Sequence, residues 1–146
     1  MSAVNLSVPG LEFRPFRGES DYPIIASLIA GSNEYDHVER TITVDEVTRT
    51  YTHLTNCDPA QDVRFAEVDG QPVGYVRSWW FQELEGPWLG GLYGVVLPAW
   101  RRKGIGSFLR RHAENRLRQA AAELEAAGTL QPGSPRFFTV EISSTE

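Results

Sequence analysis

The sequence predicts an α/β (α+β) fold, in which helices pack on a mixed and mainly antiparallel sheet. Three observations support this class. Two strand-like segments, 63–68 and 73–81, flank Asp69-Gly70, a dipeptide typical of a tight hairpin turn. A short apolar segment, 92–97, is followed by a long stretch of helical period. A further strand-like segment, 136–142, comes after that helix, and a strand, helix and strand in succession favour a parallel pair.

The first third of the chain contains a predicted strand and a predicted helix. Residues 11–16 alternate well enough for a strand. Ser20 and Asp21 offer side-chain oxygens that would cap the start of a helix, and Gly31 is expected to end it. The helical spacing comes from four apolar residues: Ile24, Ile25, Leu28 and Ile29.

The middle of the chain adds a second helix and three strands. Thr43 or Asp45 would start the helix, and a loop is expected at 56–61. A turn at 82–87 returns the chain into a strand at 88–97. Because the three strands between 63 and 97 are joined by short turns, they must be antiparallel neighbours.

Composition limits the class of protein. A chain of 146 residues with 41% hydrophobic residues is expected to form one domain, 1–146, with a real core. The net charge of −5 argues against a nucleic-acid partner. The single cysteine, Cys57, excludes an intrachain disulfide, and no apolar run approaches the ~18–20 residues that span a bilayer. We therefore expect a cytoplasmic protein with no membrane partner.

The strongest functional signal lies in the turn before the long helix. Its sequence is Arg101-Arg102-Lys103-Gly104-Ile105-Gly106-Ser107. Backbone N–H groups in the first turn of a helix have no intrahelical partner, and the helix dipole adds partial positive charge there. The two glycines leave room for a ligand, and three cations stand beside them. The segment therefore predicts a phosphate or pyrophosphate site, with an ordinary tight turn as the alternative.

The spacing Arg-x-x-Gly-x-Gly, entered from Val96-Leu97-Pro98, resembles the acetyl-CoA-binding motif of the GNAT superfamily of N-acetyltransferases. The resemblance covers 11–142 in element order and 96–109 at motif level. It implies acetyl-CoA as cosubstrate, no metal, and parallel fourth and fifth strands that splay apart around the pantetheine arm. The implied contacts with the coenzyme come from ten residues: Val95, Val96, Leu97, Arg101, Arg102, Lys103, Gly104, Ile105, Gly106 and Ser107. Three glycines would permit the bulge or close approach that a splay needs, or simply a twisted strand: Gly90, Gly91 and Gly94.

The catalytic groups are less well defined. Glu141, in the fifth strand near the implied cleft, would take up a proton through water, and Tyr93 would donate one. Glu83, in the turn after the third strand, is a third candidate, with a plain solvated role as its alternative. Histidine is a common general base, and two histidines are further candidates for this role, with a plain surface position as the alternative: His37 and His53.

The leading hypothesis is therefore an acyl-CoA-dependent N-acetyltransferase that moves an acetyl group from acetyl-CoA to a primary amine by direct transfer in a ternary complex. The acceptor would be a small molecule or a peptide, with its cationic amine held by Glu34, Asp36 and the turn at 83–85. The chain stops just after the fifth strand, before the helix and strands with which the family continues. We therefore expect a missing C-terminal part, or a partner chain, as in a homo-oligomer, that covers the exposed strand edge. Two alternatives stay open: a non-catalytic CoA-binding or regulatory half of a tandem acetyltransferase, and a phosphate-binding module outside the family.

Overall fold

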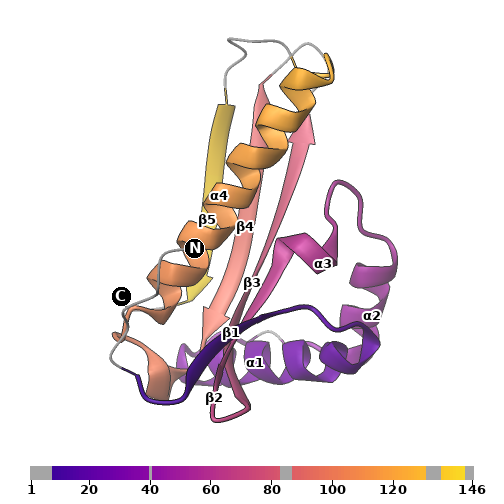
Figure 1. Ribbon diagram of the computed structural model, residues 1–146. Helices are drawn as coiled ribbons and strands as arrows, with labels where there is room; N and C mark the ends of the chain where they lie inside the picture. The colour runs from indigo at the N-terminus through magenta and orange to yellow at the C-terminus, as the bar shows by residue number, and fades with distance from the viewer. Residues whose placement is uncertain (1–7, 40, 83–86, 131–135, 144–146) are drawn as a thin grey trace.

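The computed structural model describes residues 8–39, 41–82, 87–130 and 136–143, the last range through its backbone alone. One five-stranded sheet forms the centre, in the order β1-β2-β3-β4-β5 (Figure 1). The strands are β1 (Leu11–Pro15), β2 (Val63–Val68), β3 (Gln71–Gln82), β4 (Trp88–Val96) and β5 (Arg136–Ser143). The first four are antiparallel to their neighbours and β5 is parallel to β4. The predicted α/β (α+β) class, with a mainly antiparallel sheet, is confirmed.

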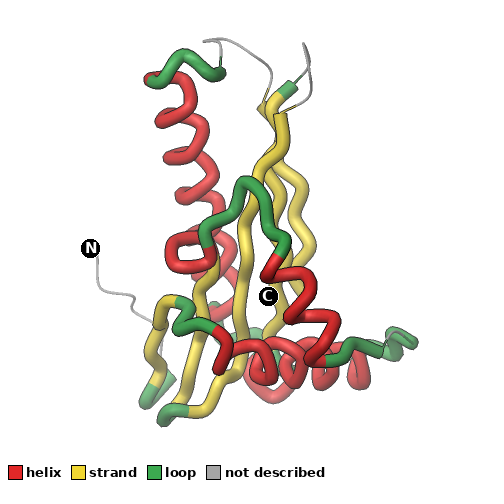
Figure 2. The backbone as a smooth tube through the Cα atoms, turned by 90° about the vertical axis from the view of Figure 1, so that its right-hand side faces the viewer, coloured by secondary structure: helices red, strands yellow, loops and turns green. Residues whose placement is uncertain are grey.

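Helices cover both faces of this sheet (Figure 2). The long helix α4 (Ile105–Ala126) packs on one face, and α1 (Tyr22–Tyr35) and α2 (Val44–Thr52) pack on the other. Three shorter helices join the elements: η1 (Glu19–Asp21), α3 (Pro59–Asp62) and η2 (Pro98–Trp100). Within the described part of the chain, no helix combines the length and the apolar character that crossing a bilayer requires.

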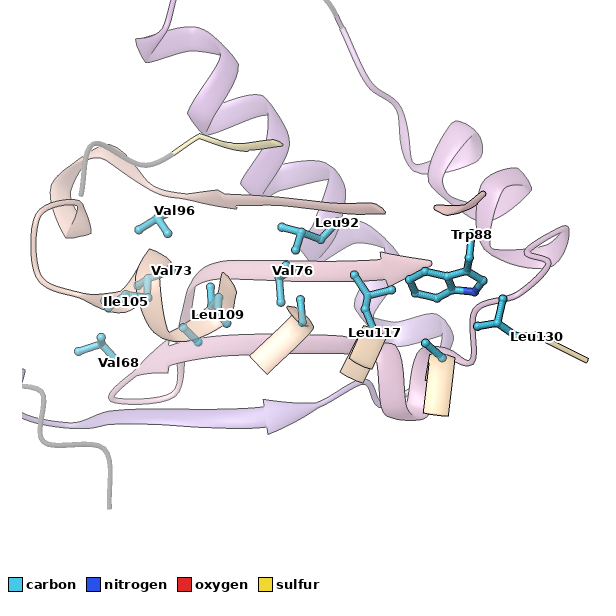
Figure 3. Packing of buried hydrophobic residues seen from close by; sticks show 13 residues of the cluster. Val68, Val73, Val76, Trp88, Leu92, Val96, Ile105, Leu109, Leu117 and Leu130 are labelled. Carbon is cyan, nitrogen blue, oxygen red and sulfur yellow. The ribbon is translucent and has the colours of Figure 1, made fainter. Parts of the chain in front are cut away.

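The α4 face is held by an apolar stripe that repeats every four residues: Ile105, Leu109, Ala113, Leu117 and Ala121. All five are buried, and they pack with Val76, Leu92 and Val96 of the sheet (Figure 3). Burying a side chain of leucine size contributes about 1.5–3 kcal/mol, so this stripe fixes the position of α4 on β3 and β4. The start of α4 is thereby fixed against the end of β4.

The opposite face has its own core. Alternate residues of each strand point to opposite sides of a sheet. Tyr75 and Val95 therefore pack with α1 and α2, while Val76 and Val96 face α4. Tyr75 of β3 and Tyr93 of β4 meet on the α1 side at a ring-centroid distance of 6.3 Å. This second face carries a cavity that is described below.

Two predictions for the first helix are corrected. The helix does not end at Gly31 but continues to Tyr35. A Cβ atom at Gly31 would lie 2.8 Å from Cδ2 of Leu97, so the glycine allows close packing inside the helix and does not end it. Asp21 does not cap α1 either, because its carboxylate accepts hydrogen bonds from the Arg14 guanidinium and the Arg17 amide.

The predicted start of α2 and the predicted hairpin between β2 and β3 are confirmed, whereas the predicted loop at 56–61 is partly helical. Thr43, and not Asp45, caps α2, since its hydroxyl accepts a hydrogen bond of 3.2 Å from the Glu46 amide. Asp69 and Gly70 both have positive φ, as a tight hairpin between β2 and β3 requires. The predicted loop at 56–61 instead contains the start of α3, which Asp58 caps by accepting from the Ala60 amide.

The predicted splay of β4 and β5 is absent over the described residues. The two strands pair without a shift from Trp88–Arg136 to Val95–Ser143. The bulge that would turn β4 away is also absent, since β4 pairs with β3 in unbroken register. An unbulged strand keeps its backbone groups aligned with both neighbours, so β5 follows it. A shift of register occurs instead in β2, between Ala66 and Glu67.

The glycines of β4 allow close packing within the sheet and do not serve the splay for which they were predicted. A Cβ atom at Gly91 would lie 2.6 Å from the Trp79 ring, and one at Gly94 would lie 2.6 Å from the Tyr75 carbonyl oxygen. Any larger residue would push β3 and β4 apart or displace the Trp79 ring.

Candidate functional site

The turn between η2 and α4 has a backbone conformation suited to binding an anion. Arg102 and Gly104 both adopt left-handed conformations, with φ of 63° and 85°. Glycine adopts this conformation freely, whereas a non-glycine residue in it costs free energy and is found most often at functional sites. Alternation of left- and right-handed residues turns successive N–H groups towards one side, which forms an anion-binding concavity.

Helix α4 begins directly after this turn. Gly104 is its N-cap residue, and the structure records no side-chain cap at this end within the described chain. The helix is 22 residues long, so its dipole places partial positive charge at Ile105 and Ser107. Arg102 and Lys103 are exposed beside the turn, while the Ile105 side chain is buried and anchors it. Two cations and the amino end of a helix therefore share one small surface.

Arg101 is used inside the protein, which corrects the prediction that three cations stand open beside the glycines. Its Nε donates to the Val96 carbonyl at 2.8 Å. Its Nη1 and Nη2 donate to the two carboxylate oxygens of Asp36 at 2.7 and 2.9 Å, and Nη2 also donates to Ser32 Oγ at 3.0 Å. The hydrogen bonds from Arg101 lower the pKa of Asp36 below its ordinary value. We call this arrangement the Arg101 clasp; it ties α1 to the end of β4 and to the turn.

A cavity of about 370 Å³ opens on the other side of the sheet. It lies between α1, α2, β3 and β4, and this size is within the range of small-molecule sites. Four aromatic side chains line it, together with the guanidinium of Arg77: Tyr51, Tyr75, Trp79 and Tyr93. Among its described lining residues there is no aspartate or glutamate. The cavity is therefore aromatic, with one formal positive charge.

No site role was predicted for Tyr51, Tyr75 or Arg77. A signal for two of them was present. Tyr75, Arg77 and Trp79 alternate along β3, so they share one face of the strand and would have been expected to line one surface. Tyr51 lies on α2, and only the packing of that helix brings it to the same cavity.

The structure places the predicted catalytic residues as follows. Tyr93 lines the cavity, and Glu141 of β5 pairs with Tyr93 in the sheet register, so these two positions are adjacent. Glu83 lies outside the described residues. His37 and His53 do not line the cavity; His53 ends α2, with its Nδ1 2.8 Å from the Arg49 carbonyl oxygen.

The turn and the cavity are joined by α1 and β4. On α1, Ser32 and Asp36 hold Arg101 of the turn, while Asn33 lines the cavity. On β4, Tyr93 lines the cavity three residues before Val96, whose carbonyl accepts from Arg101. An anion bound at the turn and a ligand in the cavity would therefore contact the same two elements.

Comparison with protein families and solved structures adds independent findings. The family model described as the acetyltransferase (GNAT) family matches residues 30–139. A search of curated proteins finds no match. A GCN5-related N-acetyltransferase from Sphaerobacter thermophilus is similar, with 26% identity and a TM-score of 0.60. The match covers 80% of this chain and 36% of that one, so this chain spans little more than a third of that protein's length.

Two further structures share the fold. An aminoglycoside acetyltransferase from an uncultured soil metagenomic sample has 18% identity and a TM-score of 0.55, and the match covers 90% of this chain and 77% of that one. YncA from Salmonella typhimurium, whose structure holds its cofactor acetyl-CoA, has 18% identity and a TM-score of 0.57, over 76% of this chain and 65% of that one.

Proposed function

This chain belongs to the acetyltransferase (GNAT) family, and from that premise we propose that it moves an acetyl group from acetyl-CoA to a primary amine. The observation that carries this proposal is the turn before α4. Left-handed Arg102 and Gly104, the start of a 22-residue helix and two exposed cations together suit a diphosphate.

The proposed coenzyme contacts differ from the first expectation in three places. The backbone of Ser107, with the side chains of Arg102 and Lys103, would hold the diphosphate, while the fully buried Ile105 would anchor the turn. Arg101 would act through the clasp, by holding the turn in position. Because β4 and β5 pair through Val95, and Val96 is fully buried with its carbonyl bound to Arg101, we assign contact with the pantetheine arm to Leu97 only. Bound acetyl-CoA would supply the acetyl thioester.

The amine acceptor would occupy the cavity. Transfer by direct attack needs a neutral amine and two oriented reactants, and it needs no nucleophile from the protein. Burial raises the pKa of the Cys57 thiol to about 11, so this thiol stays protonated at neutral pH and is a poor nucleophile. Tyr93 would donate a proton to the departing sulphur, and Glu141 would receive the amine proton through water.

Gly104→Glu tests the proposed diphosphate site. The glutamate would place a carboxylate where the diphosphate binds, and we expect the affinity for CoA, measured by calorimetry, to fall at least about 100-fold. Gly128→Glu is a matched control because Gly128 also has positive φ, 78°, but lies beyond the other end of α4. Equal affinities of the two variants for CoA would overturn the assignment.

A second function is favoured by the continuous pairing of β4 and β5. This pairing leaves no opening along β4 up to Val95, and it would suit a CoA-binding or regulatory half of a tandem acetyltransferase. Such a protein would bind CoA without releasing its thiol in the presence of any amine. Thiol release from acetyl-CoA by this chain alone would rule the second function out.

A further inference from the structure

Arg77 lies in the wall of the cavity. It belongs to β3 and pairs in register with Tyr93 of β4, so both residues face the α1 side of the sheet. Its guanidinium carbon is 4.9 Å from the centroid of the Trp79 ring and 5.6 Å from that of Tyr51. Contact with two rings restricts the guanidinium to a narrow range of positions against the cavity.

Among the side chains that the structure describes, no carboxylate forms an ion pair with this guanidinium. Three other buried or half-buried arginines are paired, since Arg14 binds Asp21, Arg101 binds Asp36 and Arg116 binds Asp62. Arg64 is a further half-buried arginine outside the ion pairs of the described residues, but it does not line the cavity. Arg77 takes part in none of the ion pairs of the described residues. A half-buried cation without a counter-charge is costly, and a ligand that supplies the anion recovers that cost.

The rest of the wall selects the body of the ligand. Tyr51, Tyr75, Trp79 and Tyr93 present rings, and Ile25 and Ile29 add aliphatic surface. Aromatic and branched apolar groups pack well against such a wall. The cavity of about 370 Å³ has room for one small molecule.

The positive charge also affects the amine. Beside Arg77, and with no carboxylate among the described lining residues, a protonated amine is disfavoured and the neutral, nucleophilic form is favoured. In the transfer step, the amine nitrogen forms a bond to the acetyl carbon as the carbon–sulphur bond breaks. The nitrogen then loses one proton, and the thiolate gains one.

We propose that the acceptor is a small α-amino acid with an aromatic or branched apolar side chain, whose carboxylate binds Arg77 and whose amine is acetylated. This inference rests on the proposed acetyltransferase function. It replaces the expectation that acidic residues hold a cationic acceptor. Asp36 is bound to Arg101, and Glu34 does not line the cavity.

Matched pairs of ligands test the inference. Phenylalanine and phenethylamine, and leucine and isoamylamine, differ only in the carboxylate. Calorimetric titration of the full chain, with CoA present, should show at least about 10-fold tighter binding of each amino acid. In Arg77→Gln, the ratio of the affinity for the amino acid to that for its amine should fall close to one. Arg77→Lys should keep part of this preference for the amino acid. The control variant Arg111→Gln, on the exposed surface of α4, should leave the affinity ratio of each pair unchanged.

The outcomes separate this inference from the proposed function. Equal binding of amino acid and amine, or tighter binding of the polycations spermidine and kanamycin, would overturn the inference even if CoA binds and thiol is released. The inference is supported if the preference for the carboxylate disappears in Arg77→Gln while the circular dichroism of this variant is unchanged. This holds even if no turnover is detected. Loss of CoA binding or of thiol release counts against the proposed function alone.

Discussion

The Arg101 clasp makes a quantitative prediction about stability. The side chain of Arg101 is 5% exposed and that of Asp36 is 29% exposed. Asp36→Ala leaves the buried guanidinium with two of its four hydrogen bonds, whereas Arg101→Met leaves the buried Val96 carbonyl and Ser32 without this donor. Both changes therefore remove partners from groups that water cannot easily reach.

The expected magnitudes follow from burial. Removing one partner of a buried ion pair costs about 3–5 kcal/mol, and partial exposure of Asp36 places this pair at the lower end. We expect about 3 kcal/mol for Asp36→Ala and about 3 kcal/mol for Arg101→Met. The double variant lacks both charges and should cost about 4 kcal/mol, which gives a coupling energy of about 2 kcal/mol.

Urea unfolding of the four proteins at neutral pH measures these values, provided that the slopes agree. The dependence on pH gives a second test. Because the pKa of folded Asp36 is lower than its ordinary value of 3.8, the contribution of the clasp is fully present above that pH. It is lost as the pH falls through the lower, folded value. The coupling would be refuted if the cost of the double variant equalled the sum of the two single costs to within about 0.5 kcal/mol. It would also be refuted if the destabilisation by Asp36→Ala became smaller already at pH ~6.

Two further predictions concern Gly94, which is buried, and His112, which is half-buried. Gly94→Ala should lower the free energy of unfolding by about 2–3 kcal/mol in urea titrations, because the new Cβ would lie 2.6 Å from the Tyr75 carbonyl oxygen. A cost below about 0.5 kcal/mol would contradict this. Burial, followed by the charges of Arg64 and Arg116, lowers the pKa of His112 below 6.5, so the unfolded chain binds the proton more tightly. Stability should therefore decline as the pH falls from 6.5 towards the folded pKa, and His112→Gln should abolish that part of the pH dependence.

The local elements were predictable because their causes are local. The hairpin at Asp69 and Gly70 follows from turn chemistry, and α4 follows from apolar residues at helical spacing. The turn at Gly104 could be recognised for the same reason, since a positive φ next to a helix start is a property of a few adjacent residues.

The errors arose where a distant residue changes the outcome. Gly31 is a plausible end of a helix by itself, and only contact with Leu97 explains why α1 continues through it. Arg101 has the appearance of an open cation, yet it binds Asp36, 65 residues earlier in the chain. The straight register of β4 with β3 and β5, which closes the expected splay, is likewise set by pairing across the sheet.

Sequence alone was therefore enough to identify the element order, the parallel last strand pair and the glycine turn, because periodicity and backbone preference act over a few residues. Tertiary packing decided which cations are available and what lines the cavity. It placed Arg77 between the rings of Tyr51 and Trp79 and gave Arg101 to Asp36, because charge pairing and desolvation depend on neighbours that the chain brings together only when it folds.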